Sequence, residues 1–249
     1  MSANHAAFNL IFRFVENYIS PIAGRISSQR HVMAIRDGFI SAMPFMIVGS
    51  FLLVFAYPPF SPDTTWGFAR AWLDLAKEFE GRILTPFDMT MGIMSIYICA
   101  AISYNLGKHY EKSNQLDPFM CAMLSIMAFL LIAAPKTNGT LPVDSLGGTG
   151  IFTAILVAIY CVEMMRFLKA HNIGIRLPDQ VPPMIKNSFD LLIPVLVVVL
   201  TLYPLSLFIQ HHFDMLIPQA IMAIFKPLVS AADSLPAILL AVLIGHLLW

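Results

Sequence analysis

Five apolar stretches constrain the fold of this 249-residue chain more than any other feature. A transmembrane helix needs about 20 consecutive, mostly apolar residues, and each stretch reaches or approaches that length. They cover about 38–57, 91–106, 118–134, 151–165 and 189–209, and a sixth apolar segment covers 235–249. The pattern predicts an all-α membrane protein: a polytopic transmembrane helix bundle with about five complete spans, a truncated sixth segment and interfacial amphipathic helices.

The small share of charged residues is consistent with a membrane environment and excludes other classes of protein. Charged residues make up 12% of the chain and hydrophobic residues 58%, whereas a soluble domain is about 25% charged. A nucleic-acid-binding protein carries a basic excess, but here 15 Lys and Arg residues balance 15 Asp and Glu residues. We therefore expect a lipid bilayer around the chain and no nucleic-acid partner.

Two segments outside the spans have the character of helices that lie on a membrane surface. Near the N-terminus, apolar residues recur at spacings of three and four: Phe8, Ile11, Phe12, Val15 and Ile19. The segment 213–229 is also rich in apolar residues, but it contains Pro218 and Pro227 and is therefore predicted to be a broken interfacial connector. Ordinary packing against the bundle is the alternative for both segments.

Basic residues are distributed unequally between the two alternating sets of loops. With five crossings, ten basic and seven acidic residues fall on the side of the N-terminus, and five basic and eight acidic residues fall on the opposite side. Because Lys and Arg accumulate in cytoplasmic loops, the N-terminus is predicted to be cytoplasmic. The ten basic residues are Arg13, Arg25, Arg30, Arg36, Lys108, Lys112, Arg166, Lys169, Arg176 and Lys186.

The few charged residues near the spans lie at span ends. They are Asp37 beside Arg36, Glu163 near Arg166, and Asp190. Charges cost little at such positions because water reaches them, so interfacial ion pairs or helix caps are the simplest interpretation. A gate contact between two moving domains is the alternative.

Structural roles are the simplest interpretation of several further groups. Three cysteines without a Cys-x-x-Cys pair are expected to be buried free thiols: Cys99, Cys121 and Cys161. Aromatic residues at span edges are expected to anchor the chain at the membrane surface: Tyr57, Trp66, Tyr110 and Tyr203. The sequence Gly147-Gly148-Thr149-Gly150 predicts a flexible turn, and Lys108, His109 and Lys112 a solvated loop.

Neither a metal site nor a self-contained enzyme is indicated. His211 and His212 cannot share one helix face, and beyond Asp214 no further ligand follows at a suitable spacing. His246 lies deep in an apolar segment, where a transport role and a packing role are both open. No phosphate-binding glycine loop, nucleophile elbow or zinc-protease helix is found. We therefore expect no metal and no cofactor.

Two longer motifs carry a resemblance to a known family. The first comprises Gln29-Arg30-His31, the run 34–40 (AIRDGFI), Met43-Pro44 and Gly49-Ser50. The second comprises Leu177-Pro178-Asp179, Val181-Pro182-Pro183, Ser188-Phe189 and Leu192-Ile193-Pro194. Together they resemble enzyme IIC, the permease component of the bacterial phosphoenolpyruvate-dependent phosphotransferase system, in its lactose/cellobiose/diacetylchitobiose branch.

The resemblance implies a homodimeric, multi-pass permease of the bacterial cytoplasmic (inner) membrane. Its substrate would be a β-linked disaccharide such as cellobiose or diacetylchitobiose. Phosphorylated enzyme IIB, with enzyme IIA upstream, would phosphorylate the sugar during transport. The loops 108–117 and 166–186 are the segments that we expect to meet enzyme IIB or the moving domain.

The resemblance also locates the sugar site mostly beyond this chain. The last residues, Leu247-Leu248-Trp249, resemble the start of a Leu-Leu-Trp-Phe-Phe-Gly-Ile-His-Gly run, whose histidine would follow Trp249. Trp249 is therefore the substrate-binding residue expected in this chain, and no catalytic residue is expected. His246 precedes the motif and is not its histidine.

Four parts are predicted on this basis. Residues 1–31 are expected to form an N-terminal interfacial amphipathic helix and a cytoplasmic lead-in, and residues 32–209 a five-span scaffold and dimerisation domain. Residues 210–234 are expected to form an interfacial connector, and residues 235–249 the truncated start of the transport domain. The chain is expected to be the N-terminal part of a permease. One alternative is a truncated, transport-inactive scaffold that only dimerises. An unrelated membrane enzyme would need carboxylates or histidines clustered within the spans, which the sequence lacks.

Overall fold

The computed structural model describes residues 20–114, 116–135, 139–175 and 189–232, and in addition 17, 178, 180–182, 185 and 239. This part of the chain is nearly all helical. The helices are α2 (Ser20–Ser27), α3 (Arg30–Ala56), α4 (Gly67–Phe87), α5 (Met94–Asn114), α6 (Pro118–Ala133), α7 (Ile151–Ala170), α9 (Leu192–Phe213) and α10 (Ile217–Ala232). A π-helical turn, Asp88–Gly92, precedes α5, and a 3-10 turn, Gly148–Gly150, precedes α7.

Four segments of the described chain are long and apolar enough to cross a membrane. They are Arg30–Ala56, Gly67–Ser113, Gly148–Ala170 and Leu192–Phe213, and α6 is a shorter apolar helix. Each predicted span corresponds to one of α3, α5, α6, α7 and α9. The predicted all-α, multi-pass architecture is therefore confirmed, although several helices extend beyond the predicted boundaries. The sixth segment, 235–249, apart from Leu239, and most of the N-terminal amphipathic segment lie outside the described residues.

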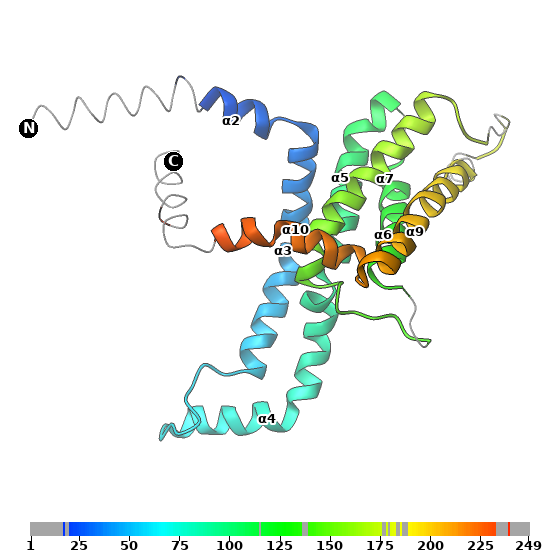
Figure 1. Ribbon diagram of the computed structural model, residues 1–249. Coiled ribbons are helices and arrows are strands. Elements are labelled where there is room, and N and C mark those ends of the chain that lie inside the picture. The colour runs from blue at the N-terminus through cyan, green and yellow to red at the C-terminus, as the bar shows by residue number, and fades with distance from the viewer. Residues whose placement is uncertain are drawn as a thin grey trace, which may run out of the picture.

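A bundle of α5, α6, α7 and α9 forms the centre of the fold, and α3 packs along α5 (Figure 1). The amphipathic helix α10 crosses this bundle and contacts α7 and α6. The largest fully buried side chains of the core include Phe129 of α6, Ile98 and Ile102 of α5, and Val198 of α9.

The contact between α3 and α5 depends on small residues along one face of α3. Ala34, Gly38 and Ala42 are buried at intervals of four residues, which places them on the same face. A Cβ atom at Gly38 would lie 2.4 Å from Cγ1 of Ile102 and 2.9 Å from its backbone nitrogen. Only glycine permits the two backbones to approach this closely, as is common for helices packed within membranes.

The segment before α7 is held against the start of α5. The backbone N–H of Ser95 donates to the carbonyl of Leu146 (2.9 Å), and the Ser95 hydroxyl donates to the carbonyl of Gly147. A Cβ atom at Gly150 would lie 2.1 Å from the Ser145 carbonyl oxygen. The turn at 147–150, predicted to be flexible, is thus a 3-10 turn anchored to α5.

Helix α4 is an element that the sequence prediction missed. It lies across the far end of α3, and the chain then continues beside α3 into α5 (Figure 1). Two hydrogen bonds attach it to the end of α3: Trp72 Nε1–H donates to the carbonyl of Phe55 (3.2 Å), and the Tyr57 hydroxyl donates to Glu80 (2.8 Å). The pKa of Tyr57 is raised first by its hydrogen bond to Glu80, which the neutral phenol donates, and then by the repulsion that a phenolate would meet from this carboxylate.

Two local predictions about connecting segments were wrong. Within the connector 213–229, which was predicted to be broken, residues 217–229 belong to one continuous helix, α10. Pro218 is its second residue, where a missing N–H costs nothing, and Pro227 is accommodated within the helix. The predicted loop 108–117 is largely helical, because α5 continues to Asn114 and α6 begins after Asp117. Asp117 caps α6 by accepting hydrogen bonds from the N–H groups of its first turn.

The close approach of α3 and α5 predicts a sharp difference between two glycines. Gly38→Ala forces α3 away from Ile102 and is expected to lower the free energy of unfolding by about 1–3 kcal/mol, the usual cost of overpacking. Gly81→Ala is the matched control, because Gly81 lies within α4 with no atom near its Cβ position. It is expected to leave stability unchanged or to raise it by up to about 1 kcal/mol. Equilibrium unfolding in detergent measures both, and equal stabilities would contradict the packing described.

Candidate functional site

The charged residues predicted at span ends form ion pairs of different kinds. Arg36 Nε contacts Asp37 Oδ1 at 2.8 Å, in a pair of largely exposed neighbours. Lys169 Nζ lies 3.3 Å from Asp190 Oδ2 and links α7 to the residues before α9. Within the described residues, the carboxylate of Glu163 contacts more side chains than the carboxylate of Asp37 or of Asp190. Ion pairing at span ends is therefore confirmed for all three carboxylates.

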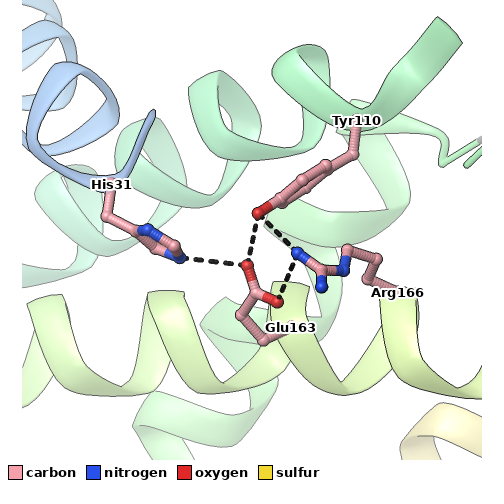
Figure 2. Close-up of polar contacts among 4 residues, drawn as sticks. All are labelled: His31, Tyr110, Glu163 and Arg166. Carbon is pink, nitrogen blue, oxygen red and sulfur yellow. Dashed lines mark hydrogen bonds and ion pairs between the residues drawn. The ribbon is translucent and has the colours of Figure 1, made fainter. Parts of the chain in front are cut away.

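The carboxylate of Glu163 is the centre of a four-residue polar cluster (Figure 2). Its Oε1 accepts hydrogen bonds from His31 Nε2 (3.0 Å) and from the Tyr110 hydroxyl (2.6 Å). Its Oε2 lies 3.1 Å from Arg166 Nη1, which also donates to the Tyr110 oxygen (2.8 Å). Because a carboxylate only accepts hydrogen bonds, His31 carries its proton on Nε2. We call these four residues the Glu163 cluster.

The aromatic ring of Tyr110 lies close to two guanidinium groups. The Cζ atom of Arg166 is 4.9 Å from the ring centroid, and that of Arg30 is 5.3 Å away. Cations at these distances are attracted to the electron-rich face of the ring. Tyr110 is 1% exposed, so its predicted role as a membrane-surface anchor is wrong. It is a buried side chain that bonds to both Glu163 and Arg166 and has Arg30 over its ring.

Helix ends explain why these residues meet. Arg30 and His31 are the first two residues of α3, Tyr110 lies near the end of α5, and Glu163 and Arg166 lie in the last turns of α7. The three ends meet on one side of the bundle (Figure 1). Glu163 and Arg166 share a face of α7 because they are three residues apart. His31 and Glu163, in contrast, are 132 positions apart in the chain.

Sequence reasoning identified Glu163 and Arg166 but missed His31 and Tyr110 as their partners. His31 lies within the motif 29–31. That motif indicated the family, but it did not predict that His31 contacts Glu163. Nothing in the sequence distinguished Tyr110 from the exposed aromatic residues Tyr57 and Trp66.

The other residues considered at the sequence level do not join this cluster. His211, His212 and Asp214 are exposed at the end of α9. Within the described part of the chain, no three His, Cys, Asp or Glu side chains gather closely enough to hold a metal ion. Cys99, Cys121 and Cys161 are buried free thiols, as predicted. Trp249, the predicted substrate-binding residue, and His246 lie outside the described residues.

The fold and the apolar helices define a multi-pass membrane protein, and comparison with known families specifies which kind. The family model described as "Phosphotransferase system, EIIC" matches residues 36–249. The chain therefore belongs to the EIIC family of the phosphotransferase system, as its two motifs indicated.

Individual relatives agree with this assignment. The chain is 32% identical to the cellobiose-specific EIIC component of Geobacillus stearothermophilus, over 95% of this chain and 54% of that protein. It is 29% identical to the lichenan permease IIC component of Bacillus subtilis, over 97% of this chain and 55% of that protein. A lactose-specific EIICB component of Streptococcus mutans is 33% identical over 86% of this chain and 37% of that protein.

A solved structure supports the fold directly. The crystal structure of ChbC, the IIC component of the N,N'-diacetylchitobiose-specific phosphotransferase system, matches with a TM-score of 0.80 and 32% identity. The match covers 95% of this chain and 56% of ChbC. The chain thus spans about half the length of the EIIC proteins that it matches.

The number of partners around Glu163 predicts that its carboxylate stabilises the fold more than an exposed one does. Glu163→Gln removes the charge that His31, Tyr110 and Arg166 share. It is expected to lower the free energy of unfolding by about 2 kcal/mol, in the range for hydrogen bonds to charged groups. Asp37→Asn, which breaks the exposed pair with Arg36, is expected to cost less than about 1 kcal/mol. Unfolding in detergent compares the two variants, and an equal or smaller loss for Glu163→Gln would contradict a structural role of the cluster.

Proposed function

We propose that the chain is the N-terminal part of a sugar permease, enzyme IIC of the phosphoenolpyruvate-dependent phosphotransferase system, which translocates a β-linked disaccharide of the cellobiose or diacetylchitobiose type. The match of the EIIC family model to residues 36–249 is the observation that carries this proposal. The named specificities of the relatives, cellobiose and N,N'-diacetylchitobiose, support the sugar class.

The described helices would contribute a rigid scaffold against which a transport domain moves. The buried contacts between α3, α5, α6 and α7 favour this role, because closely packed helices resist deformation. An elevator-like motion needs one such fixed body, and the remaining spans would carry the sugar across the membrane. Trp249 would be the part of this chain that contacts the sugar. A homodimer joined through the scaffold would hold two such bodies in place.

The excess of basic residues on one side supports a cytoplasmic N-terminus. The Glu163 cluster would then face the cytoplasm, together with the exposed Lys108 and Lys112 at the end of α5. Phosphorylated enzyme IIB, which receives its phosphate from enzyme IIA, would approach this side. Two of the described cationic side chains are thus available to an acidic or phosphorylated partner surface.

A truncated scaffold that dimerises without transporting sugar is the second candidate. This candidate concerns the 249 residues by themselves, which align with only about half of each EIIC relative. The two candidates differ in whether the chain supports transport once the remaining spans are supplied.

Transport by a completed protein distinguishes the two candidates. The 249 residues would be joined to the remaining C-terminal part of the Geobacillus cellobiose component and expressed in a strain without its own β-disaccharide permease. We expect phosphoenolpyruvate-dependent uptake of cellobiose or diacetylchitobiose, and none of the α-linked disaccharide maltose. In this fusion, Trp249→Ala is expected to raise the KM for the sugar by about ten-fold or more, as removal of a central aromatic contact does.

The 249-residue chain expressed alone is the control. It is expected to insert into the membrane without accumulating sugar phosphate. Uptake by the chain alone would contradict a sugar site located mostly beyond Trp249. A correctly inserted, dimeric fusion that transports no sugar would favour the scaffold candidate.

A further inference from the structure

A groove of about 410 Å³ runs along the end of α7, next to the Glu163 cluster. Its apolar lining comes from Tyr160, Met164, Phe167 and Ala170, and its polar lining from Glu163, Arg166 and His171. The apolar residues recur at intervals of three and four and therefore form one stripe along the helix. The groove thus follows the axis of α7 and does not cross it.

The length of the groove corresponds to one leaflet of a bilayer. From Tyr160 to His171 the helix rises about 17 Å at 1.5 Å per residue. That is about half of the roughly 30 Å hydrocarbon core of a membrane. Because α7 ends at Ala170, the Arg166–His171 end lies near the membrane surface, whereas Tyr160 lies deeper.

At the surface end of the groove, Arg166 keeps hydrogen-bond donors that no described residue accepts from. Arg166 contacts both Glu163 and Tyr110 through Nη1. Its Nε and Nη2 make no hydrogen bond within the described part of the chain. His171 donates from Nδ1 to the carbonyl of Phe167 (2.9 Å), so its other ring nitrogen, Nε2, is an acceptor in the neutral ring and offers no donor to an anion. A guanidinium group with two free donor positions suits a phosphate oxygen.

The charges around the Arg166–His171 end of the groove favour binding of an anion. Both carboxylate oxygens of Glu163 are occupied by His31, Tyr110 and Arg166. Lys169 is paired with Asp190. Arg30 and Arg166 together outnumber Glu163 by one positive charge. An isolated Glu163 carboxylate would repel a phosphate, but here its negative charge is compensated by the nearby arginines.

We propose that the α7 groove binds one anionic phospholipid, with an acyl chain along Tyr160, Met164 and Phe167 and the headgroup phosphate at Arg166. Basic pockets beside transmembrane helices bind anionic headgroups in this manner. The lipid would cover the apolar side chain of Phe167, which is 53% exposed in the structure. It would also bring a phosphate to the arginine that is paired with Glu163.

Native mass spectrometry of the purified 249-residue chain tests this site. The chain would be incubated with phosphatidylglycerol or with phosphatidylcholine of identical acyl chains. Preferential retention of phosphatidylglycerol is expected. Arg166→Gln is expected to reduce that retention by about five-fold, since a basic residue near the surface contributes about that factor in anionic-lipid binding. Lys108→Gln, which removes an exposed cation from α5 on the same side of the bundle, is the matched control and is expected to leave retention unchanged.

A second variant separates lipid binding from loss of the polar cluster. Met164→Trp fills the groove without altering any residue of the Glu163 cluster, and it is expected to lower phosphatidylglycerol retention while the unfolding midpoint is kept. Unchanged retention in both Arg166→Gln and Met164→Trp, or equal retention of the two lipids by the wild-type chain, would overturn the proposal.

Two further outcomes exclude other occupants. Excess glycerol phosphate, which has the headgroup chemistry but no acyl chains, is expected not to displace the lipid, and displacement would overturn the assignment to a phospholipid. Phe167→Cys is expected to form no disulfide-linked dimer under mild oxidation. A disulfide-linked dimer through this position would show that a second copy of the chain covers the groove.

Discussion

The carboxylate of Glu163 is the interaction on which the arrangement of the helix ends depends. Its two oxygens contact His31 of α3, Tyr110 of α5 and its own neighbour Arg166 on α7 (Figure 2). Three helices that are far apart in sequence are thereby joined at one end of the bundle. Farther along α3, Gly38 sets the distance to α5 by close contact with Ile102. The polar contact fixes the end of α3, and the close packing fixes the position of α3 along α5.

The position of this cluster limits its electrostatic cost. A carboxylate in the middle of a bilayer is expensive, whereas one near a helix end retains some contact with water. The Glu163 side chain is 30% exposed, so it keeps part of its hydration while accepting its hydrogen bonds. The cluster also compensates the charge: Arg166 is paired with Glu163, and Arg30 is held over the ring of Tyr110. Such a site is stable without excluding an additional anion near Arg166.

Hydropathy predicted the transmembrane helices well, because a long apolar segment has few alternatives to crossing a bilayer. The same criterion missed α4, whose charged residues, such as Arg70, Asp74 and Lys77, resemble those of a loop. It also interpreted the prolines of α10 as breaks, although Pro218 lies at the start of that helix, where proline is favourable. The family resemblance was recognisable from two motifs. The partners of Glu163 were not predictable, since nothing in the local sequence around His31 or Tyr110 specifies a contact with a residue more than fifty positions away.

A double-mutant cycle between His31 and Glu163 tests most directly whether their contact joins α3 to α7. The free energy of unfolding in detergent would be measured for His31→Ala, Glu163→Gln, the double variant and the unaltered chain. The structure predicts a coupling energy of about 1 kcal/mol or more, as found for residues in one hydrogen-bond network. Additivity within about 0.5 kcal/mol, the behaviour of distant and independent sites, would contradict it.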